Sequence, residues 1–181
     1  MSGIIRRIDE LGRIVLPKEI RKILKLTTGD ALEIYLENGE VKMLKYLPLS
    51  KNLGEIESIA NSVLNSINKS VIITDNEKVI VANGELSHLK NEKLSKSALE
   101  IIEKQSSFSL SKKDGASPLK ITENSKEDCF MQIIMPITSG QSKAVGLIAV
   151  CGFNEGENFD ATDIKLLNFV AQMLFGFYGN A

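Results

Sequence analysis

Residues 3–46 read GIIRRIDELGRIVLPKEIRKILKLTTGDALEIYLENGEVKMLKY, and this stretch decides how the N-terminal part of the chain folds. Short β-branched runs at 4–8 and 14–16 predict two strands, and Gly12 between them predicts a tight turn with a positive φ. Pro17 predicts the first residue of a short helix, because that position has no use for a backbone N–H. Gly29 is expected to end the helix.

The second half of the stretch predicts a β-hairpin. Apolar and polar residues alternate over 32–37, the dipeptide Asn38-Gly39 favours a two-residue turn, and 41–46 reads as the returning strand. A unit of this size buries too little apolar surface to be stable by itself. We therefore expect it to complete its core with a second copy, which would place two basic segments side by side.

Charge is distributed unevenly along the chain. The net charge is −1, yet residues 1–25 carry +4, residues 49–181 carry −3, and all four arginines lie within the first 21 residues. The planar, permanently charged fork of arginine suits phosphates and guanine edges. Charge alone is equally compatible with a solvated basic face that has no partner. The candidate contacts to a polyanion are Arg6, Arg7, Arg13, Arg21 and Lys22.

The order of the residues favours the nucleic-acid hypothesis. The pattern Gly-x-x-Arg-Arg-x-Asp-x-Leu-Gly-Arg-x-x-x-Pro-x-Glu-x-Arg resembles the swapped-hairpin DNA-binding domain of the AbrB family, transition-state regulators of spore-forming bacteria, and the resemblance covers residues 3–48. It implies that two chains interleave their strands into one dimeric β-barrel. The same five basic side chains would then face double-stranded DNA, with a preference for A·T-rich shape.

The resemblance also assigns roles to the residues around those side chains. Asp9 and Glu19 are expected to orient the arginines as charge partners. Relatives often carry a second arginine where Lys22 stands, which implies a weaker or purely electrostatic contact at that position. No exposed helix carries the Asn, Gln and Arg set of a dedicated base-reading helix.

The rest of the chain predicts an α+β domain with helices on an antiparallel sheet. Amphipathic periodicity predicts a helix over 56–67, and further helices are expected over 95–105 and 164–177, the last capped by Asp160 or Thr162. Apolar runs predict strands at 71–74, 79–82, 130–137 and 144–151, whereas the Ser-rich run 106–113 is ambiguous. We expect a DNA-binding domain over 1–50, a linker over 51–55 and the second domain over 56–181.

The run VGLIAV at 145–150 resembles the penultimate strand of GAF domains, although any antiparallel core strand would look similar. That resemblance implies a pocket between the sheet and its connecting loops, with a ligand that the sequence does not identify; no cofactor is expected. Residues 164–177 are apolar on more sides than one sheet covers, which predicts a contact with a second copy. Dimerisation through residues 1–50 and through this helix would together give a tetramer.

Other chemistry has little support in the sequence. Cys129 and Cys151 are too few for a disulfide framework and have no basic neighbour in sequence, so buried structural thiols are expected. His88, expected in an exposed loop, cannot form a metal site alone. No catalytic or metal-binding residue is predicted. The absence of a long apolar run or an export signal favours a cytoplasmic protein without a membrane partner.

These features favour a DNA-binding regulator of sporulation genes, acting in the forespore as an activator or repressor, and not an enzyme. One alternative is a GAF-based redox enzyme similar to the free methionine sulfoxide reductases, with Cys129 or Cys151 as the nucleophile. Another is an antitoxin-like module that binds a protein, because antitoxins share the N-terminal fold. The folded C-terminal part, in place of a short tail, lowers the weight of that alternative.

Overall fold

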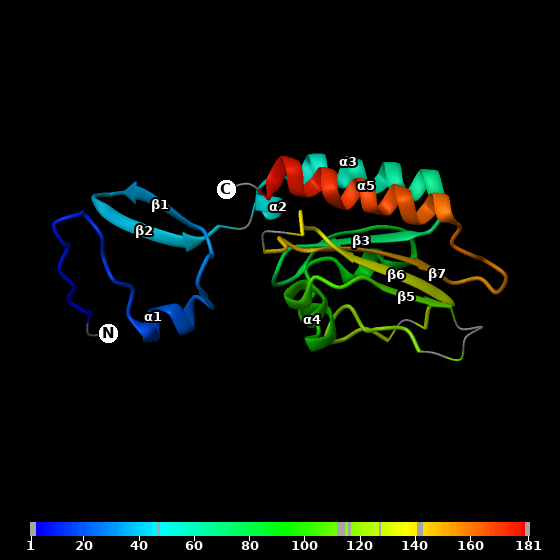
Figure 1. Ribbon diagram of the computed structural model, residues 1–181, viewed down its shortest axis with the longest axis horizontal. Helices are drawn as coiled ribbons and strands as arrows, with labels where there is room; N and C mark the ends of the chain where they lie inside the picture. Colours follow the sequence, from blue (N-terminus) through cyan, green and yellow to red (C-terminus); the bar gives the residue numbers. More distant parts are fainter. Residues whose placement is uncertain are drawn as a thin grey trace. The chain divides into compact units, whose positions relative to one another are not determined.

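The computed structural model describes residues 3–46, 48–111, 115, 117–126, 128–140 and 143–179. The chain divides into two compact units, Met1–Tyr46 and Leu47–Ala181, which Figure 1 shows with their elements labelled. The sequence analysis placed residues 1–50 in the first domain and a linker at 51–55. In the structure, Leu49 is fully buried in the apolar core of the second unit. Residues 48–51 therefore pack with the C-terminal unit.

The N-terminal unit contains α1 (Lys18–Ile23), β1 (Leu32–Glu37) and β2 (Glu40–Lys45). The two strands pair in antiparallel fashion, with Leu32 opposite Lys45 and Glu37 opposite Glu40. Asn38 and Gly39 have φ values of 52° and 82°, as a two-residue type I′ turn requires. The predicted hairpin is confirmed.

The strands predicted at 4–8 and 14–16 are absent, because residues 3–17 contain no strand in the described chain. A β-strand needs a neighbour for its N–H and C=O groups, and β1 and β2 pair only with each other. The apolar side chains of these segments stay in solvent, with Ile5 92% and Val15 75% exposed. A single chain therefore offers these segments no strand to join.

Both ends of helix α1 differ from the prediction, which had Pro17 as the first helical residue and Gly29 as the residue that ends the helix. Pro17 is the N-cap residue, and its carbonyl accepts the N–H of Arg21 (3.0 Å). At the other end Lys25 takes a left-handed φ of 51°, and the N–H of Leu26 bonds the carbonyl of Arg21 (2.8 Å). This bond satisfies a terminal carbonyl before Gly29 is reached. The prediction that Gly29 ends the helix is therefore wrong.

The C-terminal unit is built around an antiparallel sheet. Its elements are α2 (Pro48–Lys51), α3 (Leu53–Ile67), β3 (Ser70–Thr74), β4 (Val79–Ala82), the 3-10 helix η1 (Gly84–Leu89), α4 (Lys96–Lys104), β5 (Phe108–Ser111), β6 (Met131–Pro136), β7 (Leu147–Gly152) and α5 (Ala161–Tyr178). The strand order is β4-β3-β7-β6-β5 among the described residues, with every pair antiparallel. This is the α+β architecture predicted for residues 56–181.

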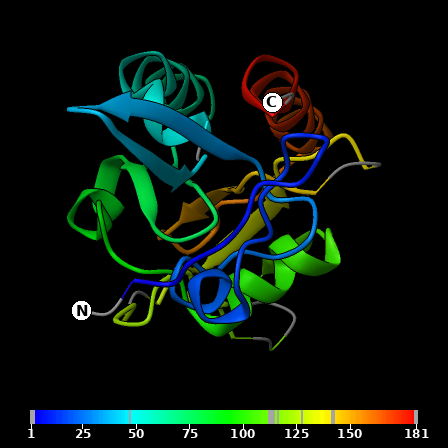
Figure 2. The same ribbon diagram turned by 90° about the vertical axis from the view of Figure 1, so that its left-hand side faces the viewer.

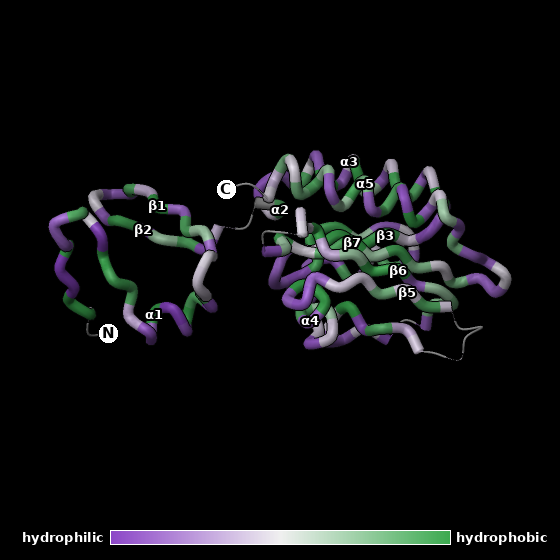
Figure 3. Tube along the Cα trace, in the orientation of Figure 1, coloured by the Kyte–Doolittle hydropathy of each residue, from purple (hydrophilic) through white to green (hydrophobic). Residues whose placement is uncertain are grey.

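Helices cover both faces of this sheet. Figures 1 and 2 show α3 and α5 side by side on one face, while α4 lies on the other. Alternate strand residues serve the two faces: Ile73 and Val150 pack toward α3 and α5, and Ile72 and Ala149 pack toward η1 and α4. Strands buried on both faces are apolar throughout, and Figure 3 shows this hydrophobic layer.

Local sequence signals explain where the helices begin. Ser95 caps α4, because its Oγ accepts the N–H of Ala98 (3.1 Å). Asp160 and Asp163 form a capping box at the start of α5, and the N–H of Asp163 is the largest cause that lowers the pKa of Asp160. The predictions for helix 95–105 and for Asp160 are confirmed. Of the ambiguous Ser-rich run, 108–111 forms the outer strand β5, and residues 112 and 113 lie outside the described residues.

Candidate nucleic-acid interface

Asp9 organises the loop that carries Arg13. Its carboxylate accepts the backbone N–H of Leu11 (3.0 Å), the backbone N–H of Arg13 (2.8 Å) and the Arg13 Nε–H (2.8 Å). Gly12 completes the turn with a φ of 75°, a conformation that other residues rarely adopt. The backbone N–H of Arg13 first, and its guanidinium second, hold the pKa of Asp9 below its ordinary value. These hydrogen bonds therefore hold the backbone of Arg13, and with it the position from which its side chain extends.

The other predicted contacts lie on neighbouring segments of the same unit. Arg6 and Arg7 lie on the extended segment before the loop, and Arg21 and Lys22 occupy the last turn of α1. All of them are exposed, and none forms an ion pair with a residue in the described part of the chain. Glu19, expected to orient an arginine, likewise has no such ion pair there. Of the two expected charge partners, the structure therefore shows Asp9 alone in that role.

The N-terminal unit has no core of its own. Pro17 is the one buried residue among residues 3–46. Apolar side chains on both the extended segments and the hairpin are exposed, including Ile5, Ile8, Val15, Ile34, Leu36 and Val41. So much exposed apolar surface on so small a unit marks an interaction surface.

The place where GAF domains are expected to bind a ligand is closed. Between the sheet and the segments that cover it on the α4 side, the remaining space is about 10 Å³, and Leu86, Leu89 and Leu119 fill its wall. That volume holds one water molecule at most. Cys129 and Cys151 line the same space and are buried as free thiols, as predicted. Gln132 lies beside them and bonds both the N–H and the carbonyl of Leu119 (2.8 and 3.0 Å).

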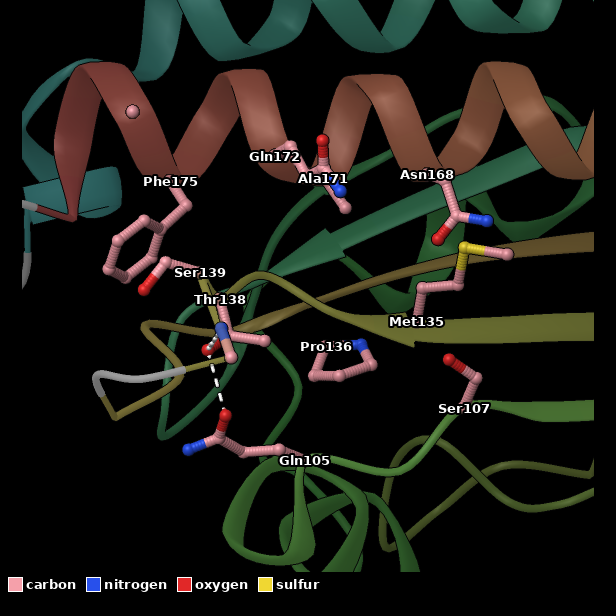
Figure 4. Close-up of a pocket in the computed structure, with 12 residues that line it drawn as sticks. Gln105, Ser107, Met135, Pro136, Thr138, Ser139, Asn168, Ala171, Gln172 and Phe175 are labelled. Carbon is pink, nitrogen blue, oxygen red and sulfur yellow. Dashed lines mark hydrogen bonds between the residues drawn. The ribbon is translucent and has the colours of Figure 1, made fainter.

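A larger hollow, of about 830 Å³, lies elsewhere on this unit, between α5 and the end of β6 (Figure 4). The sequence analysis missed it, because three segments far apart in the chain form it: 105–107, 135–140 and 168–176. The one local signal is Gly176, a glycine inside a helix.

His88 lies in η1 and is exposed, where a loop was expected. No group of three His, Cys, Asp or Glu side chains in the described ranges could hold a metal ion. Within those ranges no helix is both long enough and apolar enough to cross a membrane.

Comparison with known proteins identifies the family. Residues 52–175 match the family described as stage V sporulation protein T C-terminal, transcription factor. The chain belongs to the stage V sporulation protein T family. The N-terminal residues 5–48 also match the family described as antidote-toxin recognition MazE, bacterial antitoxin. The match over 52–175 lies in the second unit, and the match over 5–48 covers most of the first unit and ends two residues beyond it.

Two curated relatives come from Bacillus subtilis (strain 168). Stage V sporulation protein T is 47% identical over an alignment of 73 residues, which covers 35% of this chain and 40% of the relative. Transition state regulatory protein AbrB is 47% identical over 47 residues, 26% of this chain and 49% of the relative. The matches thus span half or less of each relative's length. The resemblance of the N-terminal stretch to the AbrB family is confirmed.

Solved structures add the fold of the second unit. A GAF domain from an Acinetobacter phosphoenolpyruvate-protein phosphotransferase is 14% identical with a TM-score of 0.53, covering 72% of this chain and 82% of that one. A type II free methionine-R-sulfoxide reductase from Thermoplasma acidophilum is 13% identical with a TM-score of 0.51, covering 72% and 97%. The N-terminal DNA recognition domain of B. subtilis AbrB is 46% identical with a TM-score of 0.24, covering 26% and 91%. The C-terminal unit of this stage V sporulation protein T family member has the GAF fold.

Proposed function

We propose that this chain is a DNA-binding regulator of sporulation genes that acts in the forespore cytoplasm. The observation that carries the proposal is the set of exposed basic side chains around the ordered Arg13 loop, of which Arg6, Arg7, Arg21 and Lys22 form no ion pair with another described residue. These lie in a segment 47% identical to a transition state regulator, in a chain of a transcription-factor family. Double-stranded DNA is the partner, and Arg6, Arg7, Arg13, Arg21 and Lys22 are its contacts.

The DNA-binding head is a dimer. The exposed apolar side chains of residues 4–15 and of the hairpin need cover, and the extended segments need a strand to pair with. A second copy of the same unit supplies both, as the interleaved barrel requires. Two copies then present ten basic side chains to one duplex.

The head recognises the shape of DNA more than its bases. Helix α1 has only six residues, too short to act as a base-reading helix in the major groove. Arginine is attracted to narrow, A·T-rich minor grooves by their negative potential. A·T-rich promoter regions are therefore the preferred targets.

The GAF-type unit joins two such dimers. On α5, Phe169 and Phe177 are 64% and 72% exposed, and their spacing places them with Met173 on one face of the helix. Burying this face against a second copy removes apolar surface from water. With the dimeric heads, this contact gives a tetramer.

The chain is not an enzyme in this proposal. Both thiols are buried beside a space too small for a substrate, whereas a reactive cysteine needs solvent access. Similarity to a reductase at 13% identity supports a common fold and no shared chemistry.

The MazE-type match over residues 5–48 favours one alternative, a module that binds a toxin. Purification from the native host discriminates between the two hypotheses. A small ribonuclease that copurifies in equal amounts would favour the alternative, and its absence would favour the regulator.

The proposal is tested by fluorescence anisotropy with an A·T-rich duplex and a G·C-rich duplex of equal length. We expect the wild-type chain to bind both and to prefer the A·T-rich one. Arg13→Ala should weaken binding by about 1–3 kcal/mol, the range for a lost arginine contact. Lys104→Ala removes an exposed basic side chain from α4 of the other unit. This variant is the matched control and should bind as the wild type does. Equal binding by wild type and Arg13→Ala would contradict the assignment of Arg13.

A further inference from the structure

The hollow between α5 and the end of β6 has the size of a small-molecule site. Its volume is about 830 Å³, within the range of about 300–1,000 Å³ of ligand pockets. Met135, Ala171 and Phe175 give it an apolar base, and all three are themselves at least 95% buried. Figure 4 shows Asn168 pointing from α5 toward Met135, across this space. The closed space on the opposite face of the sheet offers no comparable room.

The lining carries no charge. A quarter of the chain is charged, so about three of twelve lining residues would be expected to be, yet none is Asp, Glu, Lys, Arg or His. A charged ligand would find no oppositely charged side chain in this lining to replace the water that it loses there. Phosphates, carboxylates and ammonium groups are therefore poor occupants.

The polar groups of the lining are amides and hydroxyls. The amides are Gln105, Asn168 and Gln172, and the hydroxyls are Ser107, Thr138 and Ser139. A primary amide offers two donors and an acceptor side by side, which matches the N–H and C=O of a peptide group. The apolar base suits an aliphatic side chain. The chemistry thus favours an uncharged ligand of the amide type.

The site is held in shape before any ligand arrives. Thr138 donates its Oγ1–H to Gln105 Oε1 (2.9 Å), and the N–H of Gly140 donates to Thr138 Oγ1 (3.0 Å). Gln105 itself takes a left-handed φ of 50° at the end of α4, a conformation uncommon outside glycine and asparagine. The bond between Thr138 and Gln105 therefore ties together two of the three segments that line the hollow, 105–107 and 135–140.

Gly176 leaves open space in the wall of the hollow. A Cβ added at Gly176 would meet no atom within 4 Å, and its φ is not positive. Neither packing within the chain nor backbone conformation therefore requires glycine there. Gly176 lines the hollow, so a larger side chain at this position would take up part of its space.

We propose that this hollow binds an uncharged small molecule with paired amide donors and acceptors, of the cyclic dipeptide class. Phe175, in its wall, belongs to the same apolar cluster as Leu49 of α2. Helix α2 directly follows the N-terminal unit in the chain, so this cluster offers a route by which an occupied hollow would act on the DNA-binding head. That regulatory role rests on the proposed DNA-binding function, whereas the site itself does not.

The test uses the full chain and calorimetric titration with cyclo(Gly-Leu), which is uncharged. The open-chain dipeptide Gly-Leu, a zwitterion with the same side chain, is the matched ligand. We expect saturable binding of the cyclic compound and at least about tenfold weaker binding of the open-chain one, a difference that corresponds to one uncompensated polar loss. Equal affinity for both compounds, or no binding of the cyclic compound, would overturn the proposal.

Variants place the binding in the hollow. Gly176→Leu should weaken it at least about tenfold, because the new side chain fills the space. Gly54→Leu, in the first turn of α3, is the matched control: this helical glycine also has nothing within 4 Å of an added Cβ, and it should leave affinity unchanged. Gln172→Leu removes an exposed amide without filling the site and should also weaken binding. Unchanged affinity in Gly176→Leu and Gln172→Leu would overturn the assignment. Because these titrations contain no DNA, their failure would leave the DNA-binding proposal standing.

Discussion

Asp9 and Arg13 show how single residues prepare a binding loop. The carboxylate takes two backbone N–H groups and the arginine Nε–H at once, so the loop is ordered by groups only four residues apart. The resemblance of this stretch to the AbrB family implied the pairing, with Asp9 as a charge partner of an arginine. The same resemblance suggested Glu19 as a second charge partner. Whether a side chain on α1 reaches an arginine depends on the direction of the helix. That direction is not a local property.

The pKa of Asp9 tests this arrangement. Hydrogen bonds to the ionised carboxylate lower its pKa, so the folded loop gains stability above the unfolded pKa and loses it as pH falls through the folded value. In Arg13→Ala the pKa should return only part of the way, because the backbone N–H of residue 13, the larger cause, remains. Carboxyl ¹³C NMR titration measures both values. A full return to the ordinary pKa would show that the guanidinium, and not the backbone, orders the loop.

At the scale of elements, sequence patterns correctly predicted the turn, the strands and the helix cap that local contacts determine. The hairpin at Asn38-Gly39, the buried strands around 131–136 and 147–152, and the cap at Asp160 all rest on neighbours close in sequence or on strong apolar runs. The runs at 4–8 and 14–16 have the composition of strands but find no partner in their own chain. The backbone leaves α1 at Lys25, which has a left-handed φ, and no glycine marks this position in the sequence. The α5 hollow was missed because its three segments meet only in the fold.

Helix α2 is part of the core of the C-terminal unit. Leu49 is fully buried, and Ser50 donates its hydroxyl to the buried carboxylate of Asp75. We expect Leu49→Ala to lower the free energy of unfolding of this unit by about 2–5 kcal/mol, the usual loss for a buried leucine. Leu53→Ala, at a site 40% exposed, is the control and should lose much less. Urea denaturation followed by circular dichroism measures both, and equal losses would contradict the packing of α2.

At the scale of the whole molecule, two separate apolar surfaces predict an assembly. Multi-angle light scattering should give four times the chain mass of 19.9 kDa. Phe169→Glu combined with Phe177→Glu should halve that mass, because buried carboxylates without partners are costly, while the dimeric heads persist. Lys104→Glu, on α4 of the opposite face of the sheet, is the control. A wild-type mass of two chains would contradict the α5 contact.

The dependence of DNA affinity on salt tests the central claim most directly. Each neutralised phosphate releases condensed counterions, so the slope of log affinity against log salt is about −0.9 per contact. A dimeric head that uses at least five of its ten basic side chains predicts a slope of roughly −4.5 or steeper for an A·T-rich duplex. Fluorescence anisotropy from low to physiological salt provides the measurement. A flat slope, or no binding at low salt, would mean that the basic N-terminal segment serves a protein partner and not DNA.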